Sequence, residues 1–405
     1  MPRKPKRDLT IEDQLSRGPV DLPFLMLVLL LVGFGLIMVF SASYASAYYD
    51  AKKGNNPLFY ITRQAVFAML GIVVMMVVSK FNYQYLRALS FPLLALAGLL
   101  LLLTLSPLGV EINRAQRWLR LFVFFGPTYQ PSEIAKIAVI LVFAARLCKR
   151  DTEPKRKYDT RTRKGRWQDF LQRIGFMELI PYGAVLIVIC GLVVLEPHMS
   201  GTILILIGAA AVLFAAGIHW GWFIGGGVTI GSILAFIITH TAYMTNRINV
   251  WRDPWVDPRG KGFQNVQALL AMGSGGLLGL GLGQSRQKFL YIPEPENDFI
   301  FAIVVEELGF VGAALLLFLF AMLILRGYWL ALHARDKFGT LVIVGIITLL
   351  AAQVFFNIAV VTNLVPNTGI SLPFFSYGGT ALVMQLAEMG IILSISRQIP
   401  ASRRD

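Results

Sequence analysis

The feature that most constrains this chain is a series of ten long apolar segments. The hydrocarbon core of a bilayer is about 30 Å thick and offers no partner for free backbone groups, so a helix of about 20 apolar residues is needed to cross it. The segments are centred on Leu31, Val73, Leu99, Ile140, Ile187, Ile207, Gly227, Ala313, Ile346 and Leu386. Only 15% of the residues are charged, against about 25% in soluble domains. We therefore predict an all-α polytopic membrane protein with about ten transmembrane helices.

The first apolar segment, about residues 22–40, is followed by a small-residue run at 41–47 that imitates a signal-peptidase site. The apolar stretch exceeds the roughly 7–15 residues of a signal peptide, so we expect an uncleaved first helix. The predicted membrane domain is 22–396, between tails at 1–21 and 397–405.

Lys and Arg residues indicate the orientation, because the cytoplasmic side carries their excess. With the N-terminus inside, 24 of the 37 fall inside, 12 outside and one, Lys136, within a helix. Both termini are thus predicted to be cytoplasmic. The basic loop 148–178 fixes topology or binds anionic lipid, and a long extracytoplasmic loop, 240–297, joins helices seven and eight. Long uncharged runs separate the basic residues, so the net charge of +14 does not indicate nucleic-acid binding.

Most of the unusual polar residues fall in the connections predicted to be outside. Glu133 and Lys136 lie three residues apart at the start of the fourth helix, where a cation must face protein or a wet cavity. They are either a structural ion pair or a substrate anchor. The loop cations Arg117, Arg247 and Arg252 are further candidates for binding an anionic substrate.

The glycine-rich run 273–283 either cradles a phosphate or serves backbone flexibility and close packing, and it lacks the Lys-Ser/Thr ending of a P-loop. The four histidines show no metal-ligand spacing. No metal ligand is assigned, although a divalent cation, Mg²⁺ or Mn²⁺, is an open option.

Asp298 lies at the mouth of the eighth helix with apolar residues directly after it. Partial desolvation there would raise its pKa towards neutrality and suit a general base, whereas the alternative is a helix N-cap. Glu306 is about 12 Å deeper and roughly 80° around the helix, so a two-carboxylate glycosidase site is not expected. The polar pairs Gln353/Asn357 and Gln385/Glu388 either join helices or bind ligand.

Four motifs together resemble the SEDS family, the FtsW and RodA proteins of bacterial cell-wall synthesis. They are Gln130-Pro131-Ser132-Glu133 with Lys136; Gly273-Ser274-Gly275-Gly276 with Gly279 and Gly281; Asp298-Phe299-Ile300-Phe301 with Glu306-Glu307-Leu308-Gly309; and Pro373-Phe374-Phe375-Ser376-Tyr377-Gly378-Gly379. The resemblance implies a ten-helix peptidoglycan glycosyltransferase of the bacterial cytoplasmic membrane that polymerises lipid II. It implies that Asp298 is the essential aspartate and that Ser376, Gly378 and Gly379 belong to the substrate site.

Within this family the chain looks more like the FtsW division branch, with its sporulation relatives, than like RodA. The resemblance also implies work with a class B penicillin-binding transpeptidase and other divisome proteins. Two positions depart from the family pattern: Glu296-Asn297 stands where His-Thr is usual, and His198 where an aspartate is common. Alternative functions are a lipid II flippase, a RodA-type elongation polymerase and a scaffold for a partner enzyme.

Overall fold

The computed structural model describes residues 18–112, 115–120, 128–152, 166–167, 169, 175–240, 248–260, 262–289 and 291–399. Its named helices are α2 (Leu22–Tyr48), α3 (Phe59–Lys80), α4 (Gln84–Thr104), α5 (Pro131–Thr152), α7 (Phe176–Leu195), α8 (Met199–Ala215), α9 (Gly221–His240), α11 (Phe263–Gly275), α12 (Ile300–His333), α13 (Lys337–Val361) and α14 (Gly379–Ser396). Two 3-10 turns, η1 (Ala51–Lys53) and η2 (Pro254–Val256), and an antiparallel hairpin of β1 (Gly109–Ile112) and β2 (Ala115–Leu119) complete the named elements.

All ten predicted span centres lie within helices, which confirms the polytopic helical architecture. Seven helices in the described part of the chain are long and apolar enough to cross a membrane: α2, α3, α4, α7, α12, α13 and α14. Helix α5 carries charged residues at both ends, and α8 is 17 residues long. The β1–β2 hairpin departs from a purely helical fold; β2 carries Arg117 and Trp118.

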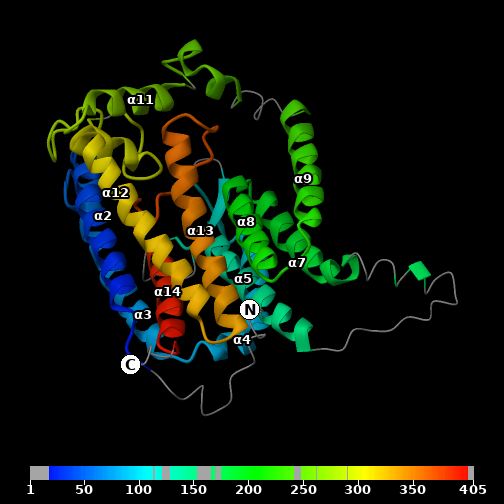
Figure 1. Ribbon diagram of the computed structural model, residues 1–405. Helices are drawn as coiled ribbons and strands as arrows, with labels where there is room; N and C mark the ends of the chain where they lie inside the picture. Colours follow the sequence, from blue (N-terminus) through cyan, green and yellow to red (C-terminus); the bar gives the residue numbers. More distant parts are fainter. Residues whose placement is uncertain are drawn as a thin grey trace.

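The core of the bundle lies around α13, α14 and α5. Helix α13 packs against α12, α8 and α5, and α14 packs against α3 (Figure 1). The most apolar windows of α13 and α14 are 61% and 67% buried, against 22% in α3, α4 and α7. Side chains from Ala135 to Ala145 of α5 are buried as well. The charged start of α5 therefore faces protein, as predicted for Lys136.

Helix α2 extends beyond the predicted end near residue 40 and continues to Tyr48. The small residues that imitate a cleavage site are helical, and Ser41, Ala42, Ser43, Ala45 and Ala47 are buried. Small side chains let neighbouring backbones approach closely. This run is thus a packing surface that contacts the region around Asp298.

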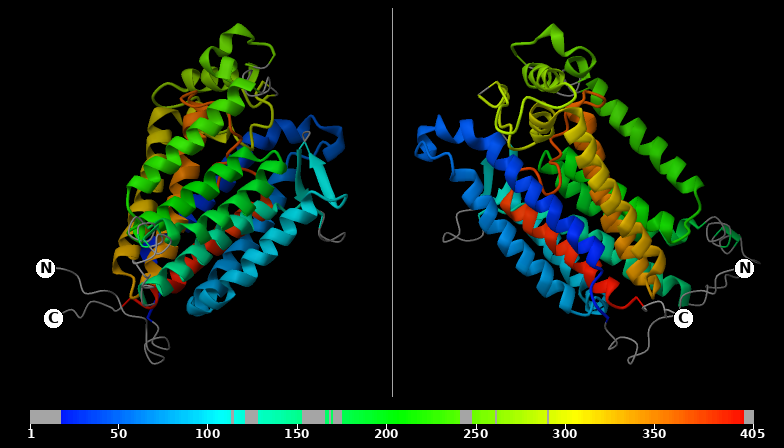
Figure 2. Two further views of the ribbon diagram at one scale, coloured as in Figure 1. Left: turned by 90° about the vertical axis from the view of Figure 1, so that its right-hand side faces the viewer. Right: turned by 60° about the vertical axis from the view of Figure 1, so that its left-hand side comes forward.

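The two ends of the described chain lie together at one end of the bundle. The Gly18 N–H donates to the Arg397 carbonyl at 2.7 Å, and Arg326 forms an ion pair with Asp21. An even number of crossings requires this arrangement. Asp298 lies at the opposite end, because α2 and α12 run antiparallel between these contacts and the site (Figure 2).

The connection between α9 and α12 is long, as predicted, but it is not structureless. It contains η2 and α11, and α11 lies across the Asp298 end of the bundle (Figure 1). The Trp251 indole N–H donates to the Asn363 carbonyl at 3.1 Å, and the Asn363 amide donates to the Trp251 carbonyl at 3.1 Å. This part of the connection is therefore docked on the end of α13.

Candidate functional site

Asp298 lies in an irregular loop, residues 292–299, that leads into α12; we call this the Asp298 loop. The helix N-cap is Phe299, and no side chain caps the helix. The N-cap interpretation of Asp298 is therefore wrong, because Asp298 stands one residue before the cap. Within the described residues no group donates a hydrogen bond to its carboxylate, which is partly buried. Asp298 is thus held through its backbone, and its carboxylate is available for chemistry.

A second irregular loop, residues 369–378, holds the Asp298 loop in place; we call it the C-terminal loop. The Ser376 hydroxyl donates to the Asn297 carbonyl at 2.8 Å, and the Tyr377 N–H donates to the Glu296 carbonyl at 2.8 Å. The Asn357 amide of α13 donates to the carbonyls of both Asp298 and Ile370 at 2.8 Å. These contacts fix the backbone on both sides of Asp298.

Amide side chains from two further helices anchor the C-terminal loop. Gln64 of α3 accepts from the Gly378 N–H at 3.3 Å, and Gln385 of α14 accepts from the Phe374 N–H at 3.1 Å. We predicted that Gln385 and Asn357 either join helices to one another or bind ligand. In the structure both join a helix to a loop instead. A sequence signal for Gln64 existed, since it is a polar residue in an apolar helix, but its partner could not be read from the sequence.

The predicted substrate residues of the C-terminal loop are occupied by structural contacts. The Ser376 hydroxyl accepts from the Leu372 N–H at 2.7 Å as well as donating to the Asp298 loop. A Cβ on Gly379 would lie 2.2 Å from the Phe67 ring. Ser376, Gly378 and Gly379 thus shape the loop that holds Asp298, and contact with substrate stays a prediction for each.

The electrostatic environment of Asp298 suits a proton acceptor. Burial, and after it the charge of Glu294, raise the pKa of Asp298 to about 6, while the positive charge of Arg117 opposes the rise. Gly369 lies directly against the carboxylate, since a Cβ built on it would be 3.3 Å from Asp298 Oδ2. At neutral pH most of the Asp298 side chains would be ionised and able to accept a proton.

Glu133 and Lys136 form an ion pair at the start of α5. The Lys136 Nζ lies 2.8 Å from Glu133 Oε2, and the two side chains are 3% and 11% exposed. The buried Glu388 of α14 interacts electrostatically with both. The pair predicted from the sequence therefore exists, and whether it also anchors substrate stays a prediction.

A group of buried and partly buried polar side chains surrounds the Pro197 turn between α7 and α8. The Arg117 guanidinium donates to the Pro197 carbonyl, and Gln130 contacts the His198 ring at 3.3 Å. Burial lowers the pKa of His198 to about 3, helped by the positive charges of Arg117 and Lys136. His198 is therefore neutral at physiological pH.

Glu196 is a site residue that the sequence analysis missed. Its side chain is fully buried, and burial raises its pKa to about 7 against the opposing influence of Thr104 and Arg117. Arg117 thus acts on Asp298, Glu196 and His198 together. Arg117 therefore links the Asp298 loop electrostatically to the polar side chains around the Pro197 turn.

Of the two arginines predicted in the long loop, Arg247 and Arg252, only Arg252 lies within the described residues. Arg252 is exposed on the docked segment that contains Trp251, and among the described residues no hydrogen bond or ion pair joins it to Asp298. Arg247 lies outside the described residues. A substrate role stays a prediction for both.

The described residues do not supply a metal cage of their own. Among them, no three His, Cys, Asp or Glu side chains come together. Mg²⁺ is commonly held by one or two carboxylates together with substrate phosphates. Asp298 alone would fit only such a substrate-borne ion, so we assign no catalytic step to a metal.

The apolar helices, with the Asp298 carboxylate at the mouth of α12, define a polytopic membrane protein whose polar site lies at one end of the bundle. Glu306 is excluded from that site, because it is fully buried and bonded to Ser285. Asp298 and Glu306 therefore do not form a two-carboxylate glycosidase centre, as predicted.

Comparison with known proteins identifies the family. The family described as "Cell cycle protein", which comprises FtsW, RodA and SpoVE, matches residues 22–400. The chain is 41% identical to stage V sporulation protein E of Bacillus subtilis over 379 residues, 93% of this chain and 97% of that protein. It is 38% identical to "Probable peptidoglycan glycosyltransferase FtsW" of Geobacter metallireducens over 381 residues, 94% of this chain and 95% of that protein. The chain belongs to the FtsW/RodA/SpoVE family, also called SEDS.

Solved structures share the fold. A chain from a peptidoglycan synthase complex that coordinates polymerization and crosslinking superposes with a TM-score of 0.72 at 28% identity, covering 95% of this chain and 99% of that one. RodA of Thermus thermophilus superposes with a TM-score of 0.63 at 27% identity, covering 95% and 98%.

Proposed function

We propose that this protein is a peptidoglycan glycosyltransferase that polymerises lipid II into glycan strands for cell division. The observation that carries the proposal is the Asp298 carboxylate, which has a pKa of about 6 and is held only through its backbone. Its relatives bear the names "Probable peptidoglycan glycosyltransferase FtsW" and "Stage V sporulation protein E". Higher identity to these proteins than to RodA supports the division and sporulation branch.

The reaction joins the acceptor sugar hydroxyl to the anomeric carbon of the lipid-linked donor. As this C–O bond forms, Asp298 accepts the hydroxyl proton, and the bond from the anomeric carbon to the polyprenyl pyrophosphate breaks. A general base contributes typically about 10²–10⁴-fold to such a step. Positioning and electrostatic stabilisation supply the rest.

Negative charge develops on the pyrophosphate as it leaves, so cations should face it. Arg117 fits this role best, because it acts electrostatically on Asp298. Lys136 is a second candidate, although its charge is already balanced by Glu133 at 2.8 Å. Arg252, which is exposed on the docked segment, and Arg247, which lies outside the described residues, stay further candidates for this role.

The proposed location is the bacterial cytoplasmic membrane, with the Asp298 end of the bundle outside and both termini in the cytoplasm. The excess of Lys and Arg at the terminal end supports this orientation. Bilayer-embedded helices would leave the lipid tails in the membrane while the sugars reach the Asp298 loop. Similarity to a synthase complex that couples polymerization and crosslinking supports a class B transpeptidase as partner. The divisome is the proposed wider assembly.

The test is polymerisation of fluorescent lipid II by the purified full-length protein. The wild type should make glycan strands, and Asp298→Asn should make none. That variant should be at least as heat-stable as the wild type, because burial penalises the charged form it removes. Glu111→Gln, an exposed carboxylate on β1, is the matched control and should be fully active.

Undiminished polymerisation by Asp298→Asn would refute the assignment of the base. Lipid II reorientation in vesicles should be measured with the same preparations, because it separates the transferase from the flippase alternative. Reorientation without strand synthesis would favour a transporter. A transporter is also expected to place its substrate site near the bilayer midplane, whereas Asp298 lies at a helix mouth.

A further inference from the structure

Helix α12, which follows Asp298, is broken. It has 34 residues, so a straight helix would be about 51 Å long, well beyond the roughly 30 Å of hydrocarbon. Gly309, at φ 67° and ψ −170°, divides it into 300–308 and 310–333. In the first part, which we call the short segment, nearly every side chain is buried, whereas Phe310 and Phe318 of the second part are 65% and 59% exposed. The break separates a segment enclosed by protein from a lipid-facing helix.

The glycine-rich run 273–283 pairs with the backbone at this break. Four N–H···O bonds connect them: Leu280 to Glu306 at 3.0 Å, Gly281 to Glu307 at 2.9 Å, Phe310 to Gly276 at 2.9 Å and Val311 to Leu277 at 3.1 Å. A Cβ on Gly279 would lie 2.2 Å from the Glu307 carbonyl oxygen, and one on Gly309 would lie 2.3 Å from the Gly279 nitrogen. The glycines therefore serve close packing, the second of the two interpretations left open by the sequence.

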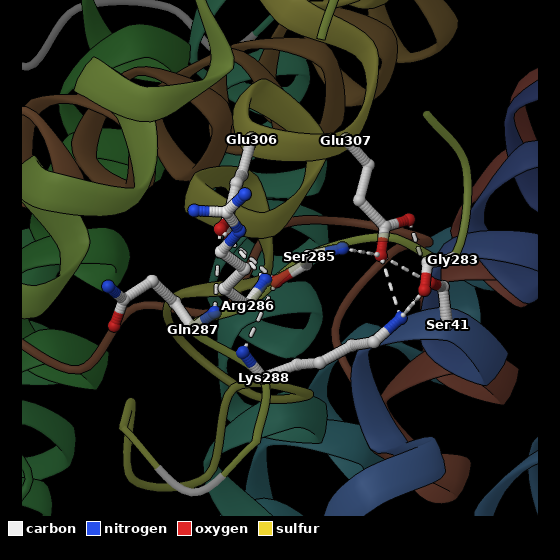
Figure 3. A network of polar contacts seen from close by, with 8 residues as sticks. All are labelled: Ser41, Gly283, Ser285, Arg286, Gln287, Lys288, Glu306 and Glu307. Carbon is white, nitrogen blue, oxygen red and sulfur yellow. Dashed lines mark hydrogen bonds and ion pairs between the residues drawn. The ribbon is translucent and has the colours of Figure 1, made fainter. Parts of the chain in front are cut away.

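A buried ion pair fastens the end of the short segment (Figure 3). The Lys288 Nζ lies 3.0 Å from Glu307 Oε1 and donates to the Gly283 carbonyl at 2.6 Å. The Ser41 hydroxyl of α2 donates to Glu307 at 2.6 Å, and Lys288 reaches Ser41 at 3.3 Å. The side chains of Lys288 and Glu307 are 3% and 0% exposed. The pair thus joins the loop, the short segment and α2.

Glu306 is bound just as completely beside it. The Ser285 hydroxyl donates to Glu306 Oε2 at 2.5 Å, and the Arg286 N–H donates to Oε1 at 2.9 Å (Figure 3). Both buried carboxylates therefore have partners of their own. Neither is positioned to exchange protons with substrate, which leaves them without a role in the proposed reaction.

We propose that Lys288, Glu307 and Ser41 form a latch that positions the Asp298 carboxylate. They are positioning residues, since none of the three contacts the Asp298 carboxylate. The proposal rests on the proposed glycosyl transfer and explains why charged residues occupy a buried site. A well-packed apolar set would often be as stable as a buried ion pair, so the pair is better explained by the geometry it imposes.

A small tilt of the short segment at Glu307 would displace Asp298 at the other end of the segment. Glu307 follows Ile300, the first residue of the helix, by seven residues, about 10 Å along the helix axis. A tilt of the short segment by about 6° would therefore move its start, and with it Asp298, by about 1 Å, and a misplacement of that size can cost about 10²-fold in rate. The latch holds the Glu307 end of the short segment against α2, which is a separate transmembrane helix.

The experiment compares Lys288→Met, Glu307→Gln and the double variant in the full-length protein. Each single variant leaves a buried polar group without its partner and should lower both heat stability and activity. The double variant should regain most of the heat stability. Its kcat for lipid II polymerisation should stay about 100-fold below wild type, with KM nearly unchanged, because only the geometry is lost. Arg286→Gln, which removes an exposed cation of the same loop and keeps its backbone donor, is the control.

Two further readouts separate positioning from folding. The acid limb of the pH–rate profile should move in the double variant from about 6 towards the ordinary Asp value of about 3.9, as the carboxylate leaves its buried position. Hydrogen exchange in 300–308 should accelerate while exchange in α14 does not. A double variant with wild-type kcat, or with only KM raised, would overturn the latch. If the wild type itself fails to polymerise lipid II, the proposed function falls, and unchanged exchange in 300–308 would then refute the latch independently.

Discussion

The most direct prediction concerns the pH dependence of polymerisation, because Asp298 must be ionised to accept a proton. Its pKa is raised to about 6, chiefly by burial. The ionised fraction would then be about 0.9 at pH 7 and about 0.1 at pH 5, whereas an Asp with the ordinary pKa of about 3.9 would still be about 0.9 ionised at pH 5. Activity is thus present above the raised pKa and lost as the pH falls through it. We expect kcat/KM to fall about tenfold between pH 7 and pH 5.

The charged neighbours of Asp298 predict the direction in which the acid limb of the pH–rate profile should move when each of them is removed. Glu294 raises the pKa of Asp298 and Arg117 lowers it. Glu294→Gln should therefore move the acid limb to lower pH, and Arg117→Gln should move it to higher pH. Arg117→Gln should also lower the rate at the plateau, if Arg117 faces the leaving pyrophosphate.

The assay is the initial rate of strand synthesis from fluorescent lipid II at subsaturating concentration across a buffer series. Samples returned to pH 7 after acid exposure control for irreversible loss of the fold. A rate that is the same at pH 5 and pH 7 would refute the assignment of Asp298 as the titrating base. A limb that both variants move in the same direction would refute the electrostatic explanation.

Three further predictions follow from single contacts. Gly369→Ala should lower kcat, because a Cβ there meets the Asp298 carboxylate at 3.3 Å and the residue has φ +70°; steady-state kinetics with a circular-dichroism check would test it. Lys136→Met should destabilise the protein by about 3–5 kcal/mol, because it leaves Glu133 buried and unpaired. Adding Glu133→Gln should restore the thermal midpoint. Strand synthesis by this double variant then shows whether the pair also anchors substrate. Gly309→Ala should lower the thermal midpoint markedly, since the left-handed backbone alone costs about 1–2 kcal/mol, and an unchanged midpoint would contradict the described break.

The transmembrane helices were predictable because lipid leaves the backbone no alternative. The same reasoning placed Lys136 against protein, where its side chain is 3% exposed. The β1–β2 hairpin was not predicted, because a short extramembrane connection is under no such constraint. The end of α2 was set too early, since the small polar residues 41–47 look like a helix end until their partners, Glu307 and Glu296, are known.

The sequence predicted which residue is the candidate base, but it did not predict how the surrounding loops hold that residue. Asp298 stood out because a carboxylate precedes an apolar run, yet its position before the cap depends on backbone torsions that the sequence does not specify. The glycine-rich run could not be interpreted alone, because its partner, the break at Gly309, lies about thirty residues away. Glu196 was not predicted as a site residue, because nothing in its local sequence indicates complete burial.

The anchors of the two loops explain how one carboxylate can be fixed in place and still act as a base. Gln64, Asn357 and Gln385 bind only backbone groups of these loops. Amides carry no charge, so they satisfy the buried backbone without stabilising the ionised form of Asp298. Lysine or arginine at position 357 could donate to the same carbonyls as Asn357 but would lower the pKa of Asp298, and at positions 64 and 385 neither could accept from the backbone N–H groups. Neutral anchors therefore leave burial as the dominant influence, and burial raises the pKa towards the working pH of a general base.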